Sequence, residues 1–296
     1  MSSPNYSKIG LSFFSTRPPW RLGKVASKLA IYILALIVLT VLMIPIAWMI
    51  STSLKPTADI FEIPLRWIPT TITLENFSSQ FNDILRRIFL NSVIVGIATI
   101  VLSTFSGALS AYAIARYRFW GTSSLLLFFL ASMAFPIPLI MVSMYILFVK
   151  VGLLDTYAAL VLGHTVVTLP VVVWLLKNFF DSLPIEVEEA AFMEGAGPFY
   201  TFFFVVLPMS KPAVVAAAIF VFVTSWNEFM FGLIFITSNE LRPLPVGISM
   251  YFLTQFDSAW SQMMAVAIIV TAPILVLFLV FQKSFTHGVT AGAVKG

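Results

Sequence analysis

Long apolar runs separated by short polar segments make up most of the chain. Six of these runs come close to the roughly 20 residues with which a helix crosses a bilayer. They occupy residues 29–50, 87–115, 122–148, 157–176, 213–236 and 263–281. The pattern predicts an all-α polytopic membrane protein with six transmembrane helices.

Prolines predict where the helices depart from regular geometry. Pro136 and Pro138 interrupt the third run, and we expect a break there, because a membrane proline frees backbone groups that neighbours must satisfy. Pro170 lies inside the fourth run. Prolines in residues 51–85 favour irregular or short-helical structure, and those in residues 237–258 favour a structured loop.

The basic residues predict the orientation of the six helices. Residues 1–28 contain five Lys or Arg residues and no acidic residue. With both termini cytoplasmic, eleven of the 17 Lys and Arg residues face the cytoplasm and six face outward. This bias agrees with the positive-inside rule, and the opposite topology would reverse it.

Composition excludes several classes of function. With 59% hydrophobic and 10% charged residues, the chain is far too apolar for a soluble domain. The net charge of +4 does not suggest nucleic acid, because the basic residues cluster beside the apolar runs. The chain lacks Cys, a nucleophile–base pair and a P-loop motif, and its two His residues are too few for a histidine metal cluster. We therefore expect neither an enzyme nor a resident cofactor.

The most acidic segment of the chain lies between the fourth and fifth runs, at residues 182–208. We expect a short helix with Pro184 in its first turn and with Asp181 or Ser182 as its cap. Gly195 permits the left-handed turn that ends such a helix. Three glutamates fall near the positive end of the helix dipole: Glu186, Glu188 and Glu189.

This segment resembles the EAA motif of type I ABC importer permeases. Glu189-Ala190-Ala191 supplies the triplet, and Glu194-Gly195-Ala196 follows at the family's spacing. Nine residues after Gly195 comes Val205-Val206-Leu207-Pro208. The sequence departs from the family pattern in two places, because Glu194 stands where Asp is usual and Val205 where Ile is usual.

Other stretches are similar to the MalG-like carbohydrate permeases, so that the resemblance covers about residues 30–296. They are Asn91-Ser92, residues 111–116 (AYAIAR), residues 152–156 (GLLDT), residues 226–229 (WNEF) and the ending 288–296 (GVTAGAVKG). The resemblance implies the type I ABC importer transmembrane fold. It divides the chain into a cytoplasmic basic tail (1–28), a first helix with an external loop (29–85), a core transmembrane domain (86–283) and a cytoplasmic C-terminal tail (284–296).

The same resemblance implies a permease subunit of an ATP-driven importer of a sugar or sugar-like solute. The subunit would lie in a bacterial or archaeal cytoplasmic membrane. Its partners would be a homologous second permease, two ATP-binding cassette subunits that hold ATP and Mg²⁺, and an extracytoplasmic solute-binding protein.

Residues 182–208 would then be the coupling loop that docks on an ATPase subunit. The implied contact residues are Glu188, Glu189, Ala190, Ala191, Glu194, Gly195, Ala196, Leu207 and Pro208. The glycine-rich tail would reach the ATPase subunits through Thr290, Gly292 and Lys295, whereas without the resemblance simple disorder is the alternative for this tail.

Glu228 is an unusual charge within the predicted fifth helix. An intramembrane carboxylate is costly and defaults to a functional hypothesis. Ser225, Trp226, Asn227 and Glu228 could line a solute path, because amides and carboxylates bind hydroxyl groups and an aromatic face stacks on a sugar ring. The alternative is a structural carboxylate bonded to a neighbouring helix or to the paired permease. For His164 we expect a packing or hydrogen-bonding role.

Two rival classes remain to be compared with an ATP-driven permease. A secondary carrier or channel would work without partners, but the sparse intramembrane charge and the six spans argue against an inverted-repeat carrier. A membrane-embedded enzyme is disfavoured because the residues for its chemistry are missing.

Overall fold

The computed structural model describes residues 20–252 and 259–290, and within them the side chains from Val25 to Gln282. The chain divides into two compact units, residues 1–49 and 50–296, and the boundary falls inside helix α1 (Trp20–Ser53). In the first unit the side chains of α1 are exposed from Val25 to Ala47, and Trp48 and Met49 are half-buried. Apart from the count of candidate membrane spans, all that follows concerns the second unit.

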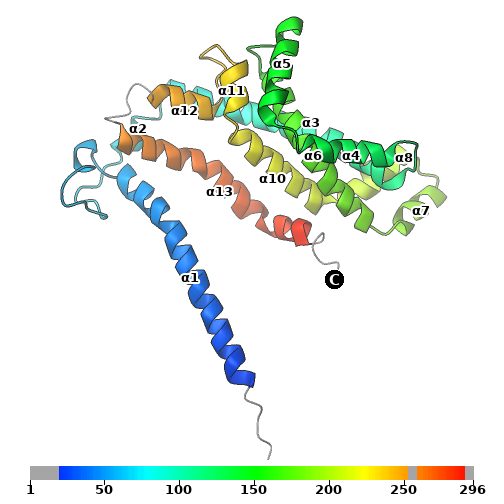
Figure 1. Cartoon of the computed structure of the whole chain (residues 1–296), viewed down its shortest axis with the longest axis horizontal. Coiled ribbons are helices and arrows are strands. Elements are labelled where there is room, and N and C mark those ends of the chain that lie inside the picture. Colours follow the sequence, from blue (N-terminus) through cyan, green and yellow to red (C-terminus); the bar gives the residue numbers. More distant parts are fainter. Residues whose placement is uncertain (1–19, 253–258, 291–296) are drawn as a thin grey trace, which may run out of the picture. The chain divides into compact units, whose positions relative to one another are not determined.

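The described part of the second unit is helical and contains no β-strand (Figure 1). Its longer helices are α3 (Asp83–Arg116), α4 (Thr122–Ser132), α5 (Ile137–Val151), α6 (Tyr157–Ser182), α10 (Lys211–Trp226) and α13 (Trp260–Thr290). Its shorter elements are η1 (Thr57–Asp59), α2 (Glu75–Ser78), α7 (Glu186–Met193), α8 (Pro198–Thr201), the π-helix η2 (Phe202–Val206), α9 (Leu207–Met209), α11 (Met230–Phe235) and α12 (Leu244–Phe252).

Helices α3, α6 and α10 pack against one another, and α13 packs on α10. Small residues allow the close approach of α3 and α6, as in many membrane helix pairs. A Cβ on Gly107 would lie 2.5 Å from Cγ1 of Val172, and the hydroxyls of Ser103 and Thr168 are 2.9 Å apart. Figure 1 shows α7 and α8 at one end of this group and α11 and α12 at the other.

Local sequence explains where the main helices begin and end. The side chain of Asn82 accepts a hydrogen bond from the Leu85 N–H at 2.9 Å and begins α3. Thr156 does the same for the Ala159 N–H and begins α6. Gly152, with a φ of +69°, ends α5 in the left-handed conformation.

Four described helices are long and apolar enough to cross a membrane, and the number rises to six if each of two bent pairs counts as one span. The bent pairs are α4 with α5 and the α8–α9 segment with α10. The predicted break in the third run is confirmed, with a bend of 102° between α4 and α5 beside Pro136. This segment therefore does not cross as one straight helix.

The predicted fifth helix, residues 213–236, is wrong in its extent. Helix α10 ends at Trp226, and the short helix α11 follows from Met230 to Phe235. Asn227 donates its side-chain amide to the Val223 carbonyl, and the Glu228 carboxylate accepts from backbone N–H groups of α11. Short polar side chains that bond to nearby backbone compete with continuation of a helix, which explains the break.

Towards the C-terminus one expectation is confirmed and one boundary differs from the prediction. The loop 237–258 contains α12, so the expectation of a structured loop is confirmed. Helix α13 extends to Thr290, which the sequence had assigned to the C-terminal tail. Gly292 and Lys295, the other predicted tail contacts, lie outside the described residues.

Candidate functional site

The acidic segment forms helix α7, as expected, and Gly195 ends it. Gly195 has a φ of +88°, and its N–H donates to the Phe192 carbonyl at 3.0 Å. The Ala196 N–H donates to the Ala191 carbonyl, also at 3.0 Å. This pair of bonds is the Schellman arrangement that satisfies the last carbonyls of a helix.

The start of α7 differs from the prediction. Asp181 and Ser182 belong to the end of α6 and do not cap α7. Asp181 pairs with Lys177 one turn earlier, and the Ser182 hydroxyl donates to the Phe179 carbonyl. Pro184 lies just ahead of α7 and separates the two helices, because it cannot donate a backbone hydrogen bond.

Most of the predicted contact residues lie on an exposed surface. Glu189, Ala190, Glu194, Gly195 and Pro208 are exposed, whereas Ala191, Ala196 and Leu207 are half-buried. Glu188 differs from all of these, because its side chain is turned into the protein and the residue is only 4% exposed.

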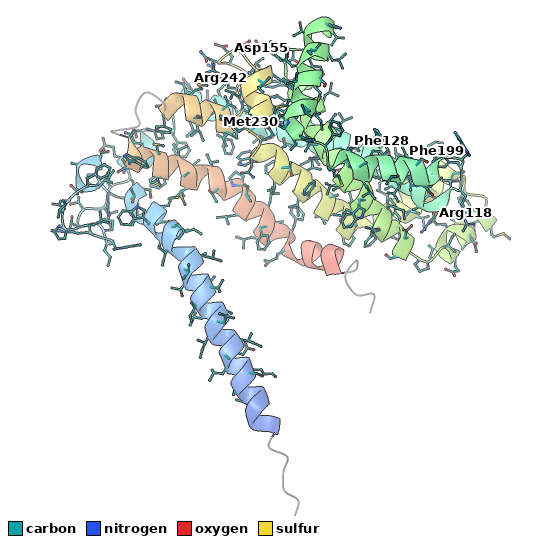
Figure 2. The ribbon with its side chains drawn as sticks, in the orientation of Figure 1. Arg118, Phe128, Asp155, Phe199, Met230 and Arg242 are labelled. Carbon is teal, nitrogen blue, oxygen red and sulfur yellow. The ribbon has the colours of Figure 1, made fainter. Side chains whose placement is uncertain are left out.

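Large apolar side chains also stand on this surface, and sequence reasoning missed them. Met193 is 89% exposed and Phe199 is 76% exposed, with Phe192 and Tyr200 beside them in the chain. Figure 2 shows Phe199 and Arg118 at the end of the helices that carries α7. Apolar side chains gathered on an acidic, polar segment are typical of a surface that binds another protein. We call residues 189–200 the α7 surface.

The carboxylate of Glu188 joins α7 to the end of α3. Its Oε1 accepts a hydrogen bond from Nε of Arg116 at 2.6 Å, and its Oε2 accepts from the Tyr112 hydroxyl at 2.8 Å. Arg116 also donates to the Leu183 carbonyl at the end of α6, at 3.3 Å. Tyr112 and Arg116 are spaced i, i+4 on α3 and therefore share one face.

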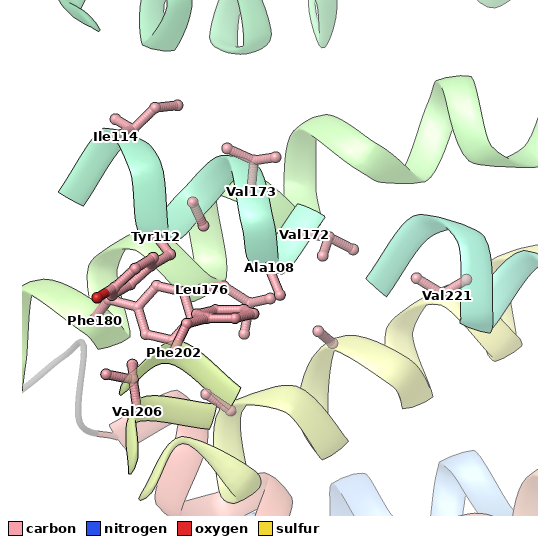
Figure 3. Close-up of a cluster of buried hydrophobic side chains, with 13 residues drawn as sticks. Ala108, Tyr112, Ile114, Val172, Val173, Leu176, Phe180, Phe202, Val206 and Val221 are labelled. Atoms are coloured by element: carbon pink, nitrogen blue, oxygen red, sulfur yellow. The ribbon is translucent and has the colours of Figure 1, made fainter. Parts of the chain in front are cut away.

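Aromatic packing fixes the position of Tyr112. Its ring centroid lies 6.0 Å from that of Phe180 and 4.9 Å from that of Phe202 (Figure 3). Phe180 belongs to α6 and Phe202 to η2, and both are buried in the apolar cluster shown in Figure 3. The hydroxyl that meets Glu188 is therefore held by packing from two other elements.

The predicted substrate-path residues divide into two groups. Trp226 is 1% exposed; its ring stacks on Phe222, meets Phe89 edge-on and donates to the Val270 carbonyl at 3.3 Å. Ser225 is also buried, and its hydroxyl lies 2.7 Å from Nδ1 of His164. These two side chains offer no free surface to a solute within the chain.

Asn227 and Glu228 are less deeply buried than Ser225 and Trp226. Asn227 is exposed, and the Glu228 carboxylate accepts from the N–H groups of Phe231 and Gly232 at 2.9–3.3 Å. One of its oxygens lies 3.4 Å from Nε2 of His164. The carboxylate thus caps α11 and meets α6, as in the structural alternative stated for it, and His164 has the expected bonding role.

At the end opposite α7, polar side chains hold the loop that follows α11. The Asn91 amide donates to the carbonyls of Glu240 and Arg242 at 2.8 and 2.9 Å. Oδ1 of Asp155 accepts from the backbone N–H groups of Thr237 and Ser238, each at 2.9 Å. These backbone bonds hold the pKa of Asp155 below its usual value. Figure 2 shows Asp155 and Arg242 at this end.

Helix α3 connects the two ends. Asn91 and Arg116 are separated by about 38 Å along α3, because each residue adds about 1.5 Å of rise. This distance exceeds the roughly 30 Å hydrocarbon thickness of a bilayer. Helix α3 is therefore long enough to place the α7 surface and the loop after α11 on opposite sides of a membrane. Among the described residues, no group of three or more His, Cys, Asp or Glu side chains could hold a metal ion.

Comparison with known proteins identifies the family. A family described as the binding-protein-dependent transport system inner membrane component matches residues 103–291. The chain is 34% identical over 284 residues to the probable ABC transporter permease protein YurM of Bacillus subtilis (strain 168), covering 95% of this chain and 91% of the relative. It is also 34% identical over 256 residues to the trehalose transport system permease protein SugB of Mycobacterium tuberculosis (strain CDC 1551 / Oshkosh), covering 86% and 93%.

A solved structure supports the fold. The structure of a bacterial ABC transporter involved in the import of the acidic polysaccharide alginate contains a chain that superposes with a TM-score of 0.75 at 20% identity. The match covers 96% of this chain and 100% of that chain. With the matched family and two relatives above 30% identity over most of their length, the chain belongs to the inner membrane permease components of binding-protein-dependent ABC transport systems.

Proposed function

We propose that this chain is one of two homologous permease subunits of an ATP-driven importer, and that it moves a sugar or sugar-like solute inward. The trehalose system of one relative supports the class of solute. Two ATP-binding cassette subunits would bind ATP and Mg²⁺ on the cytoplasmic side, and a solute-binding protein would deliver the solute outside. The chain itself would hydrolyse nothing.

One observation carries this proposal: the α7 surface exposes acidic and apolar side chains at one end of α3 while Glu188 fixes α7 to the helices. A helix with one face fixed to the rest of the protein and the other face exposed is suited to dock on a partner. Glu189 and Glu194 can meet basic side chains, Ala190 allows close approach, and Met193 and Phe199 supply apolar contact area.

Transport follows from a shift between two states. The closing of the ATPase subunits on ATP would move the α7 surface and favour an outward-facing arrangement of the permease pair. Coupling of this kind amounts to a difference of about 1–3 kcal/mol between the two states. The permease contributes no energy, because ATP binding and hydrolysis occur on the partners.

Reconstitution in liposomes tests the proposal, with radiolabelled trehalose as the first solute. The chain alone should move nothing, and uptake should appear only when the second permease, the ATPase subunits, the binding protein and ATP are all present. A secondary carrier would instead equilibrate solute without ATP or partners, and this result would overturn the proposal.

The docking role has its own test. We expect Gly195→Asp to reduce ATPase assembly or coupled uptake while membrane insertion stays intact, because Gly195 occupies a left-handed turn on the α7 surface. Unimpaired uptake by this variant would count against docking through α7.

A further inference from the structure

The buried position of Glu188 separates it from the other acidic residues of the segment. Glu186, Glu189 and Glu194 are exposed, whereas both carboxylate oxygens of Glu188 are bonded inside the chain. A residue in this arrangement cannot present its charge to a partner without breaking two bonds. Its role must therefore lie within the permease.

Helix α7 is connected to the rest of the permease along the chain, to α6 before it and to α8 after it, and also through side chains. Its close backbone neighbours are α8 and η2, through which the chain continues to α10. The other connection is made by side chains: Glu188 of α7 bonds to Arg116 and Tyr112, both on the last turns of α3. The first connection runs along the chain, and the second bypasses it to reach a different helix.

The second connection consists of short hydrogen bonds between buried side chains. The side chains of Arg116 and Glu188 are 10% and 5% exposed. A charge-assisted hydrogen bond in such surroundings resists separation, because parting the two groups would leave a buried charge without a partner. Arg116 also bonds to the Leu183 carbonyl, so the same side chain holds the end of α6.

On the basis of the proposed function, we propose that the Glu188–Arg116 pair, completed by Tyr112, is the joint through which the α7 surface moves α3. Glu188 is a positioning residue that makes α7 and the end of α3 move as one body. Since α3 continues for about 38 Å to Asn91 at the opposite end, the joint would transmit a displacement of α7 across the membrane to the loop that Asn91 holds.

The proposal predicts a loss of coupling without a loss of assembly. In the reconstituted complex, Glu188→Gln should lower the amount of solute imported per ATP hydrolysed by about fivefold or more, the lower end of typical coupling between sites. The amount of ATPase bound to the permease should stay near that of the wild type. The matched control is Glu186→Gln, which neutralises an exposed carboxylate of the same helix outside the α7 surface and should leave the solute-to-ATP ratio unchanged.

A charge swap distinguishes a joint from a contact with the partner. Glu188→Arg combined with Arg116→Glu retains an ion pair between α7 and α3 and should restore a large part of the solute-to-ATP ratio that either single change lowers. If Glu188 bound the ATPase directly, the swap would restore nothing and the single variants would lose bound ATPase. That result would overturn the proposal.

A gentler variant covers the case in which Glu188 substitutions impair folding. Tyr112→Phe removes only the hydroxyl and keeps the ring packed between Phe180 and Phe202. We expect a smaller fall in the solute-to-ATP ratio, with the yield of complex unchanged. An unchanged ratio in both Tyr112→Phe and Glu188→Gln would overturn the joint while leaving the proposed function standing. Absence of ATP-dependent uptake by the wild type would instead overturn the proposed function.

Discussion

Asp155 binds Ser238 twice: Oδ1 of the carboxylate accepts both the backbone N–H and the hydroxyl of Ser238, each at 2.9 Å. Asp155 itself has a φ of +59°, which is uncommon outside glycine, and its N–H donates to the Phe235 carbonyl at 2.9 Å. The turn before α6 thereby anchors the loop that follows α11. That loop lies at the end of the helices opposite α7. Under the proposed function this end faces outward, and the contact between Asp155 and Ser238 helps to hold its loop in place.

The pH dependence of this loop follows from the lowered pKa of Asp155. A carboxyl group whose pKa is lower in the folded state stabilises that state above its ordinary pKa, and the stabilisation is lost as pH falls below it. Protection of the Thr237 and Ser238 amides, measured by hydrogen exchange and corrected for the intrinsic rate, should therefore fall as pH drops below about 4. Asp155→Asn keeps the acceptor atom and should remove this dependence; an equal pH dependence in the variant would exclude Asp155 as its source.

Two glycines near the end of α7 allow the effect of backbone strain to be measured without a steric clash. A Cβ on Gly195 or on Gly197 would meet nothing within 4 Å, but only Gly195 has a positive φ. Gly195→Ala should therefore destabilise the end of α7 by about 1–2 kcal/mol through strain alone, and Gly197→Ala should have little effect. Proteolysis of the α7 segment checks this, and equal susceptibility of the two variants would show that φ is not the cause.

Much of the α7 segment could be predicted from local sequence, but the burial of Glu188 could not. Gly195 as the end of the helix follows from the need for a left-handed residue. Which of Glu188 and Glu189 turns inward depends on Arg116, 72 residues away in sequence. One sequence contains no signal that pairs residues so far apart, although Tyr112 and Arg116 both fall in a stretch that resembles the family.

Continuity of the fifth helix was predicted wrongly for a different reason. Hydropathy treats residues 213–236 as one apolar run, but the side chains of Asn227 and Glu228 bond to nearby backbone groups and end α10. The break at Pro136 could be predicted because proline acts through covalent geometry. The effect of a proline was thus readable from the sequence, whereas the local bonds of Asn227 and Glu228 leave no mark in the hydropathy pattern.

Close packing between α3 and α6 makes Gly107 sensitive to a single methyl group. Because a Cβ there would lie 2.5 Å from Val172, we expect Gly107→Ala to destabilise the subunit by about 1–3 kcal/mol through overpacking. Val172→Ala in the same chain should recover part of that loss by making room. Thermal unfolding of the purified subunit measures both effects, and destabilisation that simply adds in the double variant would contradict the predicted steric contact.

Because Trp226 is buried, a substitution there can distinguish a structural role in the core from a role in binding solute. Trp226→Phe keeps an aromatic ring between Phe222 and Phe89 but loses the hydrogen bond to Val270, so it should lower the free energy of unfolding by about 1–2 kcal/mol. The KM for solute in the assembled transporter should stay within about twofold, because the ring has no free face on which a sugar could stack.

Asn227→Ala is the matched comparison, because Asn227 is the exposed neighbour of Trp226. If a solute passes this point, Asn227→Ala should raise the KM with little effect on thermal unfolding, since its side-chain amide, among the described residues, bonds to Val223 alone, in the helix that Asn227 follows. The two variants should thus act on different measurements. A large rise in KM for Trp226→Phe with unchanged thermal unfolding would mean that the indole leaves the core during transport and meets the solute directly.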